Sequence, residues 1–89
     1  MTLSYRIELA PAAQRQIKKL SRQTQNHIIK QLEKLALNPR PNGVKKLSGM
    51  SDLYRIRVSD HRIIYTIDDS VLLVLVVKVG DRKEVYRSL

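Results

Sequence analysis

Arginines occupy alternating positions in a segment that has the pattern of a β-hairpin. The run from 53 to 58 carries Arg55 and Arg57, and the run from 61 to 67 carries Arg62 near its start. Successive side chains of a strand point to opposite faces, so Arg55 and Arg57 share one face, and Arg62 on the next strand can join them. A rigid sheet that presents several guanidinium groups suits the binding of a phosphate chain.

The other titratable residues give no sign of a metal site or an activated nucleophile. The chain has no cysteine, and neither His27 nor His61 has a partner at the spacing of metal ligands. Acids are few and scattered, and no glycine-rich phosphate loop or Ser-His-Asp order is present. We expect no cofactor. We interpret His27 as a surface or half-buried residue, and His61, at the hairpin corner, as a turn residue that is also a candidate acid or base.

A set of arginines can promote the cleavage of RNA without a metal ion, because RNA carries its own nucleophile, the 2′-hydroxyl group. An enzyme must place that oxygen in line with the phosphorus and stabilise the negative charge that grows on the phosphate oxygens. Guanidinium groups suit the second task, and a tyrosine can stack on a base. The candidate catalytic residues are Arg55, Arg57, Arg62, Arg82 and Tyr86. The alternative is that these arginines only solvate one face of a sheet.

The charge distribution points to an anionic partner. The net charge is +9 and the sequence pI is about 10.3. Residues 11–50 hold nine lysines or arginines against a single acid, Glu33. Such a surface attracts nucleic acid or an acidic protein. Eight of these cations are candidates for contacts with RNA or the ribosome: Arg15, Lys18, Lys19, Arg22, Lys30, Lys34, Lys45 and Lys46.

The first half of the chain has the pattern of a strand followed by two basic helices. Apolar and polar residues alternate from 4 to 9. Pro11 suits the first turn of a helix, and Ser21 is a candidate N-cap for a second helix. The segment 38–43 contains two prolines and a glycine and ends that helix.

The second half has the pattern of strands. We predict a short edge strand at 44–47, a hairpin that turns at Ser59-Asp60, and a central strand over the apolar run 71–79 that ends at Gly80-Asp81. Residues 82–86 fit one helical turn or a last strand. These elements predict one α+β domain over residues 1–89, with two helices packed on one face of a small, mostly antiparallel, curved sheet.

The hairpin and the C-terminal segment resemble a known family. Residues 49–67, with Val79-Gly80-Asp81-Arg82 and Glu84-Val85-Tyr86, are similar to the RelE family of toxin–antitoxin systems, and the likeness covers nearly the whole chain. The resemblance implies a RelE-like fold and a type II toxin that cuts messenger RNA in the ribosomal A site, leaving a 2′,3′-cyclic phosphate. It also implies an acidic, helical RelB-like antitoxin, and operator DNA bound only through the toxin–antitoxin complex.

The family's functional positions carry over residue by residue. Arg55 and Arg57 match two basic residues that are lysines in the best-known member, and Arg62 matches an arginine that supports the transition state. Arg82 matches the arginine assigned to leaving-group protonation or charge stabilisation, and Tyr86 matches the C-terminal tyrosine. Arginine does not act as a base at neutral pH. With arginine in place of lysine at positions 55 and 57, removal of the 2′-hydroxyl proton is left to water, to the ribosome or to His61.

Two other functions stay open at this point. The related ParE toxins share the architecture, lack this arginine set and poison DNA gyrase by protein binding. The second is a catalytically weak homologue that binds only an antitoxin and DNA. All five candidate catalytic positions are basic or aromatic and occur in the order expected for the nuclease, which favours that function. The sequence has no apolar run of membrane-spanning length and no signal-peptide layout, so we expect a cytoplasmic protein with no membrane partner.

Overall fold

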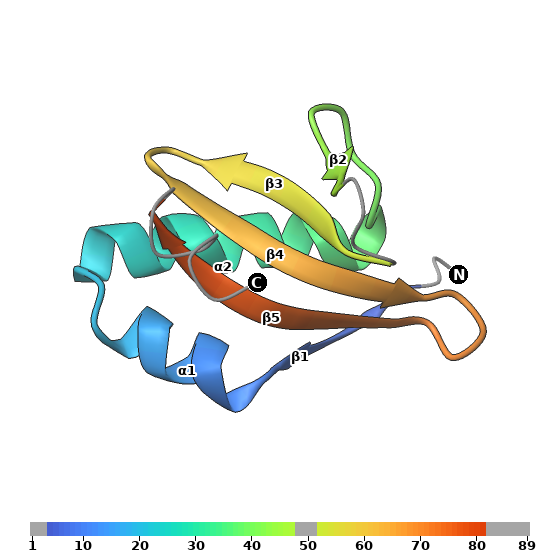
Figure 1. Ribbon diagram of the computed structural model, residues 1–89, viewed down its shortest axis with the longest axis horizontal. Coiled ribbons are helices and arrows are strands. Elements are labelled where there is room, and N and C mark those ends of the chain that lie inside the picture. The colour runs from blue at the N-terminus through green and yellow to red at the C-terminus, as the bar shows by residue number, and fades with distance from the viewer. Residues whose placement is uncertain (1–3, 48–51, 82–89) are drawn as a thin grey trace.

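The computed structural model describes residues 4–47 and 52–81 (Figure 1). Its elements are β1 (Arg6–Leu9), α1 (Pro11–Lys18), α2 (Arg22–Leu37), β2 (Lys45–Lys46), β3 (Tyr54–Val58), β4 (His61–Asp68) and β5 (Leu73–Asp81). The strands form a five-stranded sheet in the order β1-β5-β4-β3-β2. β1 runs parallel to β5, and the other neighbouring strands are antiparallel. The predicted α+β class with a mostly antiparallel sheet is confirmed.

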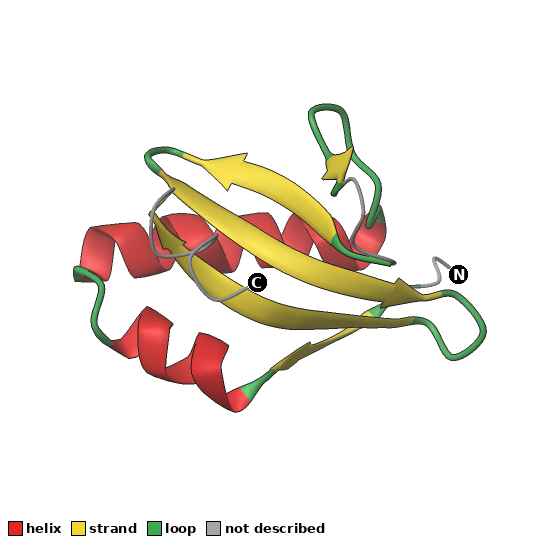
Figure 2. Cartoon of the chain, viewed as in Figure 1, coloured by secondary structure: helices red, strands yellow, loops and turns green. Residues whose placement is uncertain are grey.

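Both helices lie on the same face of the sheet (Figure 2). Pro11 takes the first position of α1, where its missing N–H leaves no hydrogen bond unmade. Ser21 caps α2, since its Oγ accepts a hydrogen bond from the backbone N–H of Thr24 at 3.2 Å. The last residue of α2 is followed by Asn38 and Pro39, as the sequence predicted. Neither described helix is long and apolar enough to cross a membrane.

The core fills the space between the helices and the three long strands. The apolar stripe of α2 is buried, with Ile28 and Leu35 fully removed from solvent. Strand residues meet this stripe from the facing side of the sheet: Ile56, Ile63, Tyr65, Val74, Val76 and Val79. Alternation along β3 and β4 therefore sends one set of side chains into the core and the other set to the face away from the helices.

Tyr65 is the largest fully buried side chain of the described residues. Its hydroxyl donates a hydrogen bond to the buried carbonyl of Pro39 at 2.7 Å. Its ring stacks on the ring of Tyr54 with centroids 5.9 Å apart. Burial raises the pKa of Tyr65, so the phenol keeps its proton and remains a donor. The residue thereby fixes the loop after α2 to the centre of the sheet.

A second contact holds the same loop from outside. Arg40 donates from both terminal nitrogens to the carboxylate of Asp69, at 3.2 and 3.0 Å, and the hydroxyl of Tyr5 donates to the same carboxylate at 2.5 Å. The Arg40 guanidinium also lies 5.5 Å from the centroid of the Tyr54 ring. We call this set the Arg40–Asp69 clamp. The hydrogen bonds from Arg40, and then from Tyr5, hold the pKa of Asp69 below its usual range.

The bounds of β5 differ from the prediction at both ends. Val71 and Leu72 belong to the turn before the strand; Val71 is 63% exposed, and Leu72 has a φ of 52°. At the other end the predicted break at Gly80-Asp81 is wrong. Gly80 pairs with Arg62 and Asp81 pairs with His61, so the ladder to β4 carries the strand through the glycine. The predicted interior position of this strand is confirmed, since β5 lies between β1 and β4. Residues 82–86 lie outside the described part of the chain.

The hydroxyl of Tyr65 gives a first prediction. Tyr65→Phe keeps the packed ring but leaves the buried Pro39 carbonyl without its donor, so the free energy of unfolding should fall by about 1–2 kcal/mol. Tyr65→Ala also opens a cavity, and the loss should rise to about 3–5 kcal/mol. Urea unfolding of the two variants measures both losses. Equal stability of Tyr65→Phe and the parent protein would contradict the role given to the hydroxyl.

The clamp gives a prediction about pH. The folded-state pKa of Asp69 is lowered, so its contribution to stability is present above the unfolded-state pKa, about 4, and is lost as the pH falls through the folded-state value. Asp69→Asn should therefore lower the melting temperature at neutral pH by a few degrees at most, because the group is exposed. The difference from the parent protein should shrink below about pH 4.

Asp60→Asn is the matched control, since Asp60 is an exposed aspartate in the turn between β3 and β4. Melting temperatures of the three proteins across the acid range test the clamp. A difference between Asp69→Asn and the parent that stays constant down to acid pH would show that the carboxylate charge is not what stabilises it.

Candidate functional site

The pairing of β3 with β4 gathers the predicted arginines on one face. Arg57 stands directly opposite Arg62, and Arg55 stands opposite Ile64. Residues paired across a ladder point to the same side, so all three arginines lie on the face away from the helices. We call this the arginine face. It is the arrangement that alternation along the two strands predicted.

Arg62 is mostly buried, with only 9% of its surface exposed. Its Nε is inaccessible and has no hydrogen-bond partner within the described residues. β5 places Gly80 opposite it, so that strand contributes no side chain at this position. A buried charged donor without an acceptor is costly, and arginine cannot shed its charge at neutral pH. An anion bound on the arginine face would compensate the charge of this guanidinium group.

The other two arginines of this face are more open. Arg57 is exposed and Arg55 is half-buried. Lys45 on the edge strand β2 pairs with Arg55 and lies on the same face. A hollow of about 330 Å³ is lined by Gly43, Lys45, Arg55 and Arg57. The face therefore offers both accessible cations and a concave surface beside them.

Lys78 is a further cation of this face that the sequence reasoning missed. It pairs with Ile64 from β5, beside the arginines. A register shift between Ile64 and Tyr65 reverses the alternation along β5, so that Val76 and Val79 both face the core while Lys78 faces the other way. The sequence feature that could have identified it is that Lys78 is the single charged residue in the apolar run 71–79.

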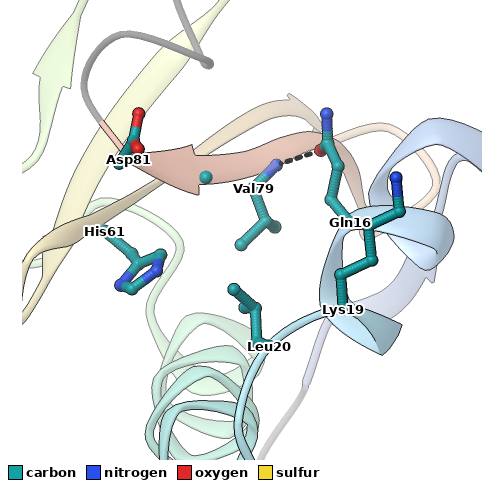
Figure 3. Close-up of a pocket in the computed structure, with 7 residues that line it drawn as sticks. Gln16, Lys19, Leu20, His61, Val79 and Asp81 are labelled. Atoms are coloured by element: carbon teal, nitrogen blue, oxygen red, sulfur yellow. Dashed lines mark hydrogen bonds between the residues drawn. The ribbon is translucent and has the colours of Figure 1, made fainter.

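The two histidines lie away from the arginine face. His27 is exposed on α2, in agreement with its interpretation as a surface or half-buried residue. His61 belongs to the helix-covered side of β4. It lines a hollow of about 430 Å³ with Gln16, Leu20 and Val79, where Gln16 accepts a hydrogen bond from the Val79 N–H (Figure 3). The structure thus places His61 on the opposite side of the sheet from Arg62.

The remaining predicted residues divide into two groups. Arg82 and Tyr86 lie outside the described residues. The eight cations proposed for RNA or ribosome contacts are all exposed, and two of them, Lys34 and Lys45, line hollows that also include Arg57. Lys19 lines the hollow at His61. Within residues 4–47 and 52–81, no three His, Cys, Asp or Glu side chains come together as a metal site.

Comparisons with known proteins agree with this arrangement. A family model described as the ParE toxin of the type II toxin–antitoxin system parDE matches residues 7–86. The chain is 31% identical over 88 residues to the mRNA interferase toxin RelE of Escherichia coli K12, a match that covers 94% of this chain and 92% of that protein. A RelE-like toxin protein of Escherichia coli is 33% identical over the same shares of the two chains.

Solved structures show the same fold. RelE in the intact Escherichia coli RelBE complex superposes with a TM-score of 0.76 at 30% identity, covering 86% of this chain and 95% of that one. A chain of the archaeal RelE–RelB complex of Pyrococcus horikoshii superposes with a TM-score of 0.78 at 26% identity, covering 92% and 97%. The chain therefore belongs to the RelE/ParE superfamily of type II toxin–antitoxin toxins and is a toxin of the RelE type.

Proposed function

We propose that this toxin is a ribosome-dependent endoribonuclease that cuts messenger RNA in the ribosomal A site. The observation that carries the proposal is the buried Nε of Arg62, which has no hydrogen-bond partner among the described residues and lies on the same face as the exposed Arg57, directly across the ladder. A fixed cation held close to the exposed guanidinium of Arg57 suits a phosphate whose negative charge grows during reaction. Two relatives with the name mRNA interferase support this class of activity.

The proposed reaction needs no metal. The 2′-oxygen attacks the adjacent phosphorus, the bond to the 5′-oxygen breaks, and a 2′,3′-cyclic phosphate remains. The proton of the 2′-hydroxyl leaves to a base, and the departing 5′-oxygen takes up a proton. Arg62, Arg57 and Arg55 stabilise the charge on the phosphate oxygens, and Lys78 adds to the positive field of the same face. Arg82 and Tyr86 complete the proposed set, for the leaving group and for holding the substrate in line.

Proton removal is the task that the arginine face does not supply. Arginine stays protonated at neutral pH, and His61 lies on the other side of the sheet. We therefore assign the base to water or to a group of the ribosome. A ribosome that holds the A-site codon would also provide the in-line orientation of the 2′-oxygen, which contributes strongly to such reactions.

The proposed protein partner is an acidic, helical RelB-like antitoxin. Structures of related toxins with RelB support a partner of this kind. The net charge of +9 favours an acidic chain, and an antitoxin that covers the arginine face would block the reaction site. The toxin–antitoxin complex, rather than the toxin alone, is the proposed operator-binding species.

Inhibition of DNA gyrase is the second candidate. The matched family model is described by the ParE toxin, which is the observation in its favour. The arginine face is the observation against it. A toxin that acts only by protein binding does not need partly buried arginines on this face. A catalytically weak homologue is the third reading, because lysine is absent from positions 55 and 57.

Arg62→Ala should lower the single-turnover rate of cleavage on stalled ribosomes by about 10²–10³-fold, because it removes one charge-stabilising group. Primer extension on a defined message measures the rate and the position of the cut. Arg6→Ala is the control, since Arg6 is an exposed arginine on β1, at the far edge of the sheet. Melting curves verify that both variants are folded. Equal rates for Arg62→Ala and Arg6→Ala would remove Arg62 from the mechanism.

Arg82→Ala should relieve growth arrest in cells that express the toxin, because the leaving oxygen loses its assigned partner. The same variant should leave the message intact on stalled ribosomes. If the parent protein also leaves the message intact with and without ribosomes, the nuclease proposal fails. A DNA supercoiling assay then separates a gyrase inhibitor from an inactive homologue.

A further inference from the structure

A second hollow adjoins the one on the arginine face. It measures about 370 Å³ and lies between α2, the loop after it and β3. It shares Gly43 and Arg57 with the hollow of about 330 Å³ described above, so the two hollows adjoin at these residues, and we call the pair the groove. From the loop and from α2 the groove is lined by Pro41, Asn42, Gln31 and Lys34. One end of the groove therefore opens at the arginine face and the other at α2.

The sheet leaves this groove open because β2 is so short. β2 pairs only with Tyr54 and Arg55, so no strand of the described chain lies beyond the rest of β3 on that side. Ile56 and Arg57 line the groove at this unpaired stretch. The groove is thus built by the register of β2 and by the loop that leads to it.

Gly43 lies where the two hollows meet. Its φ of +90° is in the left-handed region, which explains why glycine occupies this turn. A Cβ placed on it would come within 4 Å of no other atom, so it would project into open space. The missing side chain keeps the passage between the two hollows clear.

The lining has one sign of charge. Four cations line the groove, and no acid is among the described lining residues: the cations are Lys34, Lys45, Arg55 and Arg57. Gln31 and Asn42 add neutral side chains that can donate hydrogen bonds. A row of separated cations with amide donors between them suits a chain that carries one negative charge per unit.

From this geometry we propose that the groove binds the sugar–phosphate backbone of single-stranded RNA next to the cleaved bond, with Lys34 and Arg57 as phosphate contacts. The inference rests on the proposed function, because it takes the arginine face as the place where the cut phosphate lies. An RNA strand continues beyond that phosphate, and this groove leads away from the face. Of the eight exposed cations, Lys34 and Lys45 are the two that line the groove beside the reaction site.

The test uses the purified toxin and labelled 2′-O-methyl oligouridylates, which cannot be cut. Fluorescence anisotropy over a range of salt concentrations gives the affinity of a trinucleotide and of a dodecanucleotide. Lys34→Gln should weaken binding of the dodecanucleotide about fivefold and reduce the slope of log K against log salt by about 0.7. Binding of the trinucleotide, which offers fewer phosphates and can occupy the arginine face without the groove, should change less.

Arg6→Gln is the control. It removes one positive charge from an exposed position on β1, at the far edge of the sheet, and Arg6 is not a lining residue of the groove. Its effect on the dodecanucleotide should be less than twofold. Equal effects of the two variants, or a wild-type slope for Lys34→Gln, would overturn the groove as an RNA site. Unchanged RNA binding together with a weaker affinity of Lys34→Gln for an acidic antitoxin peptide would assign the groove to the protein partner instead.

The assay is independent of the cleavage reaction. If the wild-type toxin cuts no message on ribosomes but Lys34→Gln still lowers the affinity and the salt slope, the groove stands and the proposed nuclease function falls. If the wild-type toxin cuts on ribosomes and Lys34→Gln binds the dodecanucleotide like the parent, the groove proposal falls and the nuclease function stands.

Discussion

The register between β3 and β4 is the constraint on which the rest of the molecule depends. Ile56 is paired with Ile63 on the core face, and Arg57 is paired with Arg62 on the outer face. A slip by one residue would turn every side chain of a strand to the opposite face. A slip of β4, for example, would move Arg62 into the core and Ile63 to the outer face. The core and the basic face are therefore fixed by the same set of hydrogen bonds, and neither can change without the other.

This arrangement concentrates like charges. Five cations share the face away from the helices: Lys45, Arg55, Arg57, Arg62 and Lys78. Their mutual repulsion and the buried Nε of Arg62 oppose folding. The opposite side of the sheet offsets this cost through a core of aliphatic side chains and through Tyr65, which joins β4 to the loop after α2. A face that is costly to hold empty becomes favourable when an anion binds, which is the behaviour expected of a site for RNA or for an acidic antitoxin.

The family membership and the geometry answer different questions. The matched family model and the related RelE toxins identify a type II toxin. Because one fold supports both a nuclease and a gyrase inhibitor, membership alone does not choose between them. The choice rests on the arginine face, where the positions of three guanidinium groups follow from strand pairing rather than from surface composition. Arginine at positions 55 and 57 stays protonated at neutral pH and cannot act as a base, which moves the proposed base outside the toxin.

Local patterns in the sequence determined much of this protein. Period-two alternation placed Arg55, Arg57 and Arg62 on one face and Tyr65 on the other, and the N-cap at Ser21 and the helix end before Pro39 followed from residues next to them. Only the tertiary structure decided the bulge between Ile64 and Tyr65, which brings Lys78 to the arginine face, and the pairing with β4 that carries β5 through Gly80. It also decided the contact of Arg40 with Asp69 and the groove beside Gly43. The physical reason is range: alternation and capping act over a few residues, whereas register, clamps and grooves depend on segments that meet only after folding.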